Sequence, residues 1–184
     1  AGDPPRADLE LRASWTPVGP VSGAHAEAWS QLLCAAAGLP PAATPAGPIP
    51  ADQRTAFTAL HETCFPNTHT GAAAILAGEQ HYLPPLGVLT DGALVGYVAL
   101  TAEPEFGRAQ VEYLGVAPGH RGRGLATDLV RSAVHAAFRD PRVEVVSLTV
   151  SATNPAALRV YQKAGFVVER TMRCYRVVWP QPTG

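Results

Sequence analysis

The sequence is poor in charge and in cysteine. Of its 184 residues 47% are hydrophobic and only 16% are charged, against about 25% charged in ordinary globular domains. This composition excludes a wholly disordered chain. The 14 basic and 15 acidic residues nearly cancel, for a net charge of −1. Because nucleic-acid binding usually requires a basic surface, we expect no nucleic-acid partner. The three cysteines, Cys34, Cys64 and Cys174, are too scattered to predict a disulfide framework or a zinc site.

Long hydrophobic runs are also missing. None approaches the ~20 residues of a membrane-spanning helix, and the first residues lack the apolar stretch of a signal peptide. We therefore expect a cytoplasmic protein with no membrane partner. The length suits one domain that buries roughly 70% of its unfolded surface without help from a metal.

The first 50 residues read as an N-terminal extension of the domain. It is predicted to hold a loose tail over residues 1–7, a short strand over Leu9–Ala13, a helix over Ala24–Ala37 and a proline-rich linker over Leu39–Pro50. The helix rests on Trp29, Leu32, Leu33 and Ala36, which recur at helical spacing.

The core is predicted over residues 51–180, with a tail over 181–184. Helices are expected over 52–65, with Asp52 as the cap, and over 70–78, 123–138 and 154–165. Strands are expected over 86–90, 94–100, 110–116 and 143–150, followed by a strand pair over 166–179 that is broken near Arg173. Asp91-Gly92 predicts a hairpin turn. Strands and helices mix without strict alternation, which indicates an α+β or mixed α/β class around one sheet.

One segment, residues 111–126, predicts a strand, a glycine-rich turn and a helix N-terminus. Free N–H groups and the helix dipole at such a turn suit a phosphate group, and Arg121 and Arg123 add positive charge. A Walker loop is excluded because the only lysine is Lys163, far along the chain. A dinucleotide fingerprint is excluded because Thr127 stands where its last glycine is required.

Two motifs in this half of the chain resemble those of the Gcn5-related N-acetyltransferase (GNAT) superfamily. The signature Arg/Gln-x-x-Gly-x-Gly/Ala is met by Arg121, Gly124 and Ala126, and is preceded by Leu114, Val116 and Pro118 at the family spacing. One strand later stands the second motif, Asn154-Pro155-x-Ala157-x-x-x-Tyr161-x-Lys163-x-Gly165-Phe166. The resemblance covers residues 51–180.

The resemblance implies a mixed, mostly antiparallel central sheet, flanked by helices, in which one strand pair splays apart. It implies acetyl-CoA as co-substrate and no metal. Pantetheine would pair with the main chain of Leu114 and Val116, and an N–H group near Val116 would polarise the thioester carbonyl. The implied cofactor contacts are Leu114, Val116, Arg121, Gly122, Arg123, Gly124, Leu125, Ala126, Thr127 and Asn154.

Two residues are candidates for the proton transfers. Tyr161 matches the tyrosine that in the superfamily protonates the departing thiolate, although its helix position also suits a core tyrosine. Glu112 would point into the slot if its strand is regular, with Gln110 on the same face, and would be the base; the alternative is a solvated charge. Asn154, before Pro155, is equally a helix cap.

Other candidates are weaker. Thr149 stands where one bacterial subgroup has its glutamate base, so that mechanism does not transfer. His69, after Phe65-Pro66, lies in a loop and is an alternative base. His25, His61, His81 and His135 are expected to be structural, and Cys64 and Cys174 to be inert.

The resemblance implies an N-acetyltransferase that works by direct attack of an amine on acetyl-CoA in a ternary complex. The acceptor is a small amine, an antibiotic-like amine or a protein N-terminus, and a homodimer is allowed. The alternative is a non-catalytic acyl-CoA-binding module. A third interpretation takes the proline-rich first third as the remnant of a tandem arrangement.

Overall fold

A computed structural model describes residues 25–36 and 38–176 of the chain. The strand predicted over Leu9–Ala13 and the tails predicted at both ends lie outside these residues. The compact unit that holds both hydrophobic clusters and both cavities described below spans Glu27–Cys174. Among the described residues, no helix combines the length and the apolar character that crossing a membrane requires.

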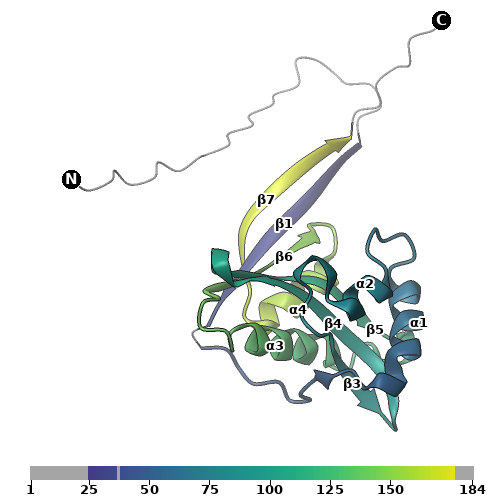
Figure 1. Cartoon of the computed structure of the whole chain (residues 1–184). Coiled ribbons are helices and arrows are strands. Elements are labelled where there is room, and N and C mark those ends of the chain that lie inside the picture. The colour runs from purple at the N-terminus through teal and green to yellow at the C-terminus, as the bar shows by residue number, and fades with distance from the viewer. Residues whose placement is uncertain (1–24, 37, 177–184) are drawn as a thin grey trace, which may run out of the picture. The chain divides into compact units, whose positions relative to one another are not determined.

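A single sheet of seven strands organises the fold (Figure 1). Its spatial order is β2-β3-β4-β5-β6-β1-β7; β5 and β6 run parallel, and the other pairings described are antiparallel. The strands are β1 (His25–Ala35), β2 (Gly47–Pro48), β3 (Leu86–Thr90), β4 (Ala93–Glu103), β5 (Arg108–Val116), β6 (Val145–Ser151) and β7 (Val167–Arg176). The helices are α1 (Arg54–Cys64), α2 (Ala72–Ala77), α3 (Leu125–Ala137) and α4 (Pro155–Ala164). The predicted fold class is confirmed.

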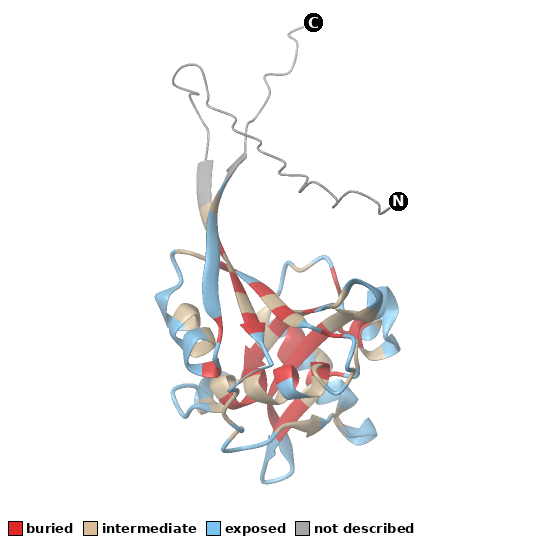
Figure 2. Ribbon diagram, turned by 90° about the vertical axis from the view of Figure 1, so that its left-hand side faces the viewer, coloured by how far each residue is buried: buried red, intermediate tan, exposed pale blue. Residues whose placement is uncertain are grey.

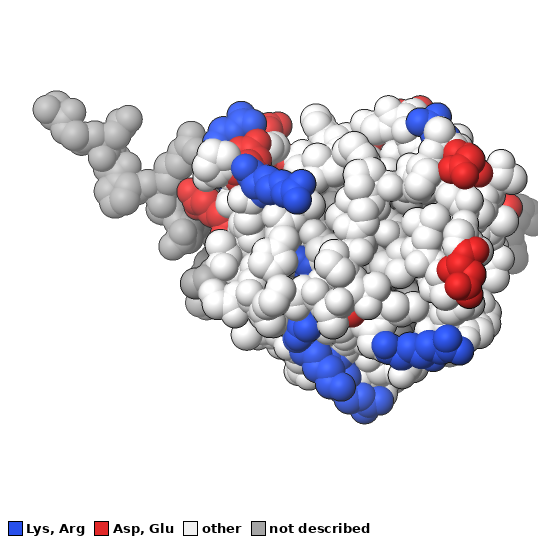
Figure 3. All heavy atoms as spheres, turned by 90° about the horizontal axis from the view of Figure 1, so that it is seen from below, with Lys and Arg blue, Asp and Glu red and all other residues white. Residues whose placement is uncertain are grey.

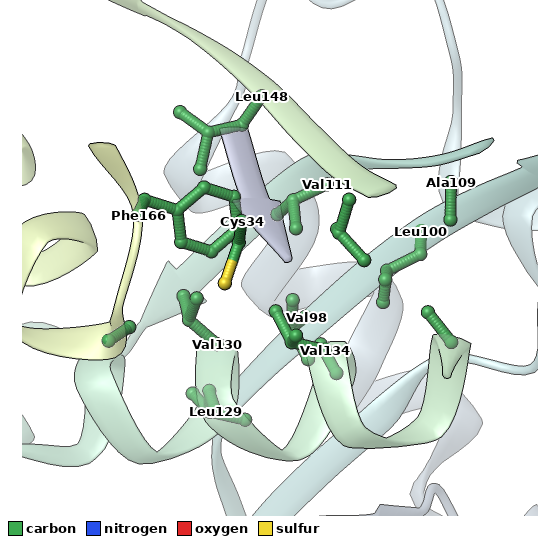
Figure 4. Packing of buried hydrophobic residues seen from close by; sticks show 14 of the residues in the cluster. Cys34, Val98, Leu100, Ala109, Val111, Leu129, Val130, Val134, Leu148 and Phe166 are labelled. Atoms are coloured by element: carbon green, nitrogen blue, oxygen red, sulfur yellow. The ribbon is translucent and has the colours of Figure 1, made fainter. Parts of the chain in front are cut away.

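Two hydrophobic clusters hold the helices on opposite faces of the sheet. The first packs Leu129, Val130 and Val134 of α3 against the strands (Figure 4). Ala164 of α4 belongs to the same cluster. The second packs Phe57 and other side chains of α1 and α2 against β4 and β5. Burial is accordingly concentrated in the central strands and the inner helix faces (Figure 2).

Local signals fix several element ends as predicted. Helix α4 begins where Asn154 Oδ1 accepts a hydrogen bond from the Ala157 N–H at 3.0 Å, and it ends at Gly165 with φ +106°. The β3–β4 hairpin turns at Asp91 and Gly92, both with positive φ.

Three predicted elements are wrong. The segment expected to be a helix over Ala24–Ala37 contains strand β1, and from Trp29 to Cys34 its side chains alternate between half-buried and buried positions in the sheet. Asp52 does not cap α1, because it lies inside a 3-10 turn over Ala51–Gln53 that precedes the helix. Strand β7 runs through Arg173 to Arg176 without a break, and residues 177–179 lie outside the described part.

Charged side chains are spread thinly over the surface. Figure 3 shows the molecule from below, with Lys, Arg, Asp and Glu in small separate groups on a mostly uncharged face. This distribution agrees with the low and balanced charge of the sequence.

Candidate active site

Strands β5 and β6 diverge after three paired positions. Arg108, Ala109 and Gln110 pair with Val145, Val146 and Ser147, and the pairing ends there. Farther along β5, Val116 lies opposite Gly96 of β4, and the next N–H group, that of Ala117, donates to Val95 O at 2.8 Å. Because N–H groups alternate in direction along a strand, those of Val116 and Leu114 point into the gap. The predicted splayed strand pair is confirmed.

A bulge in β5 sets the direction of Glu112. Ala99 of β4 pairs with Tyr113 and Leu100 pairs with Val111, so Glu112 is the extra residue. The condition of a regular strand is therefore not met at Glu112. Tyr113 packs in the cluster with α1 and α2, whereas Val111 packs on the opposite face in the cluster with α3 and α4. Gln110 and Glu112 nevertheless line the same cavity.

The larger of two cavities at this gap has a volume of about 800 Å³. Glu112, Tyr161 and Asn154 line it together with most of the predicted cofactor contacts, namely Leu114, Val116, Arg121, Gly122, Gly124, Leu125, Ala126 and Thr127. Arg123 does not line it. Trp29 of β1 and Cys64 and Phe65 at the end of α1 also line it.

The glycine-rich turn lines this cavity at the start of α3. Gly122 and Gly124 adopt φ +77° and +85°, a conformation that other residues rarely take. Arg121 Nε donates to Val116 O at 2.9 Å and so ties the turn to the end of β5. The first helical bonds run from the Thr127 and Asp128 N–H groups to Gly124 O, which leaves the N–H groups before them available for an anion.

Helix α4 brings Tyr161 to the same cavity. Its ring packs against Phe166 with centroids 6.1 Å apart, and burial raises the pKa of its hydroxyl. The hydroxyl therefore stays protonated at neutral pH and can donate a proton. Asn154 caps α4 and also lines the cavity, so both predicted roles are compatible with its position.

The smaller cavity, about 560 Å³, lies on the other side of Glu112, which lines both. Its wall is largely polar. It is lined by Gln31, Leu33, His69, Gln80, Tyr82, Thr101, Glu103, Arg108, Ala109, Gln110, Glu112, Val145, Ser147, Glu169 and Arg170.

Burial tunes the carboxyl group of Glu112. Burial raises its pKa above the ordinary value, and a hydrogen bond from Thr101 Oγ1 at 3.3 Å and the electrostatic interaction with His69 oppose that rise. A carboxylate with a raised pKa is a stronger base when it is ionised. The geometry therefore suits Glu112 to accept a proton at the junction of the two cavities.

A buried network holds the loop that carries His69. The ring of His61 is 1% exposed; its Nδ1 accepts a hydrogen bond from the Tyr97 hydroxyl at 2.6 Å, and its Nε2 donates to Thr70 O at 3.0 Å. Burial raises the pKa of Tyr97, so its hydroxyl remains a donor. The structural role expected for His61 fits these contacts.

Several lining residues carried no recognised signal in the sequence. Thr101 and Tyr82 reach the smaller cavity through strand pairing and an isolated bridge, and burial raises the pKa of Tyr82 to about 12. Gln31 and Leu33 lie in the segment that the sequence predicts as a helix, so their position in the cavity wall could not be predicted. In the part of the chain that the structure describes, no cluster of three or more His, Cys, Asp or Glu could hold a metal ion.

Comparisons with known proteins agree with this geometry. The family model described as "Acetyltransferase (GNAT) family" matches residues 51–166, and one described as "Protein of unknown function (DUF3000)" matches residues 1–45. A GNAT-family structure from Novosphingobium aromaticivorans superposes with a TM-score of 0.63 at 27% identity, over 86% of this chain and 68% of that one.

The chain is also similar in sequence to two curated N-acetyltransferases. The L-amino acid N-acetyltransferase AaaT of Escherichia coli is 32% identical over 87 residues, 46% of this chain and 54% of its own length. The N-alpha-acetyltransferase RimI of Mycobacterium tuberculosis is 37% identical over 102 residues, 53% of this chain and 60% of its own length. The chain thus spans little more than half the length of these relatives. Because the family model covers well over half of the chain and the fold agrees with it, the chain belongs to the acetyltransferase (GNAT) family.

Proposed function

We propose that this protein is an N-acetyltransferase that moves the acetyl group of acetyl-CoA to an amine by direct attack in a ternary complex. The observation that carries the proposal is that two cavities meet at Glu112. One is lined by the glycine-rich turn, whose free N–H groups suit a phosphate, and the other has a largely polar wall. A direct transfer requires two substrates to reach one point from opposite sides, and this arrangement allows it.

The larger cavity would hold acetyl-CoA, which supplies the acetyl group as a thioester. The N–H groups of Leu114 and Val116 are available for the pantetheine arm, which would hydrogen-bond to β5 in the place of a neighbouring strand. The open N–H groups at Gly124, Leu125 and Ala126 would bind the pyrophosphate. The Val116 N–H is the candidate to stabilise negative charge on the thioester oxygen.

Glu112 would accept the proton of the incoming ammonium group, directly or through a water molecule. The new bond joins the amine nitrogen to the acetyl carbon, the bond between that carbon and sulfur breaks, and the surplus proton on the nitrogen leaves to solvent water. Tyr161 would give its proton to the departing thiolate. Both assignments rest on the two side chains lining one cavity and on burial, which keeps Tyr161 protonated and makes Glu112 more basic.

The acceptor would occupy the smaller cavity. Its volume of about 560 Å³ lies within the roughly 300–1,000 Å³ typical of small-molecule sites. Relatives are named for different acceptors, among them an L-amino acid and an aminoglycoside. The proposal therefore covers small primary amines and the N-terminus of a protein chain. We place the protein in the cytoplasm, which agrees with the free thiols of Cys34 and Cys64.

The proposal is tested by incubating the purified protein with acetyl-CoA and pooled amines, and by resolving the acetylated products by mass. We expect transfer to at least one primary amine, together with a rise in melting temperature when CoA binds. Saturable binding of CoA without any transfer would instead support a non-catalytic acyl-CoA-binding module. No shift in melting temperature at millimolar CoA would contradict the cofactor assignment.

A further inference from the structure

Strand β1 completes the site although it lies outside the segment that matches the GNAT family. That segment covers residues 51–166, whereas β1 spans His25–Ala35. In the sheet, β1 lies between β6 and β7 and pairs with β6 from Trp29 to Ala35 (Figure 1). A segment from before the family domain thus forms a neighbour of the diverging strand pair.

The two faces of β1 have different surroundings. Ser30, Leu32 and Cys34 are at most 4% exposed, and Leu32 and Cys34 belong to the main hydrophobic cluster. On the other face, Trp29 lines the larger cavity, and Gln31 and Leu33 line the smaller one.

The partners of these residues on β6 confirm that this face looks into the site. Trp29, Gln31 and Leu33 lie opposite Ser151, Thr149 and Ser147. Ser151 and Thr149 line the larger cavity, and Ser147 lines the smaller one. Side chains at directly opposed positions share a face of the sheet. One face of β1 therefore lines both the larger and the smaller cavity.

Gln31 and Arg170 present hydrogen-bond donors to the smaller cavity. Arg170 Nε donates to Gln31 Oε1 at 2.6 Å, which fixes the amide so that its NH₂ group remains as donor. The rest of the Arg170 guanidinium adds further donors and a positive charge. Three acidic side chains line this wall. Glu112 is the proposed base, Glu103 is paired with Arg108 at 2.6 Å, and Glu169 precedes Arg170 on β7.

We propose that β1 is the wall that selects the acceptor, and that Gln31 together with Arg170 binds a carboxylate or carbonyl oxygen of the amine substrate. This inference rests on the proposed function, which places the reacting nitrogen at Glu112. The preferred acceptors are then amines that carry such an oxygen, as amino acids and peptide N-termini do. Donors of this type form strong hydrogen bonds with carboxylate oxygens.

The test compares pairs of acceptors that differ only in the carboxylate, such as an amino acid and its decarboxylated amine. For wild type we expect the higher kcat/KM with the carboxylated member. Gln31→Ala and Arg170→Ala should each lower that kcat/KM by about tenfold or more, the effect of one lost hydrogen bond to a charged group. The decarboxylated amine should change less than about twofold, and the KM for acetyl-CoA should stay constant.

Arg173→Ala is the matched control, because Arg173 is exposed on the same strand β7 and lines neither cavity. If Gln31→Ala and Arg170→Ala behave like this control in an active enzyme, the role of β1 is refuted and the proposed function stands. A wild-type preference for the decarboxylated amine also refutes it. If wild type acetylates no amine at all, the proposed function fails, and the acceptor role of β1 fails with it.

Discussion

Replacing Thr101 with valine should shift the pH dependence of acetyl transfer toward higher pH. Thr101 Oγ1 donates a hydrogen bond to Glu112 Oε1, and this bond lowers the pKa of a carboxyl group that burial raises. Without the donor the charged form loses stabilisation, so the pKa of Glu112 rises further. A base works only when ionised, so the rise of kcat/KM with pH then begins at higher pH.

The geometry of the bond sets the size of the shift. A hydrogen bond to a charged group contributes about 1.5–3 kcal/mol, and one pKa unit corresponds to about 1.4 kcal/mol. The distance of 3.3 Å is long for a hydroxyl donor, which favours the lower end. We therefore expect the midpoint of the profile to move upward by about one pH unit.

The assay measures kcat/KM across the pH range with one acceptor for every variant, so that ionisation of the acceptor contributes equally to each profile. Glu112→Gln should remove the rise that belongs to the base and lower the rate by about 10²–10⁴. Thr58→Val is the control, because its hydroxyl donates to Arg54 O within α1 and Thr58 lines neither cavity.

His69 distinguishes the two candidate bases. Its electrostatic interaction with Glu112 also lowers the pKa of that carboxyl group, so His69→Ala should give a small upward shift that salt screens. If His69→Ala abolishes the pH-dependent rise while Glu112→Gln preserves it, the base is the histidine. An unshifted profile for Thr101→Val would refute the role assigned to the hydrogen bond.

Three further variants test the rest of the site. Gly124→Ala should weaken CoA binding by about tenfold or more, because the added methyl group prevents close approach of the phosphate to the backbone. Gly92→Ala is the control, with a similar φ of +78° and equally open space, and should leave CoA binding intact. If calorimetry finds equal effects for the two variants, the phosphates bind elsewhere. Tyr161→Phe should lower kcat by about 10–10³ at unchanged CoA affinity, and an unchanged kcat would exclude it as the acid. Tyr97→Phe should leave buried His61 Nδ1 without a donor and destabilise the fold by about 1–3 kcal/mol, seen as a lower melting temperature.

Short-range signals in the sequence predicted the parts of this site that depend on neighbouring residues. The hairpin at Asp91-Gly92, the helix start at Asn154 and the glycine-rich turn before α3 each need a few consecutive residues to adopt one backbone conformation. Most of the predicted contacts that line the larger cavity followed from two such motifs, since Gly124 and Tyr161 keep a fixed spacing to the elements that present them.

Long-range strand pairing decided the remainder. Over residues 24–37 the apolar spacing satisfies a helix, but pairing with β6 from Trp29 to Ala35 makes this part a strand and buries Leu32 and Cys34. The bulge at Glu112 arises from the register between β4 and β5, which neither strand specifies alone. The junction of the two cavities at Glu112, and the part that Gln31 plays in the second, therefore exist only in the assembled sheet, because partners distant in sequence create them.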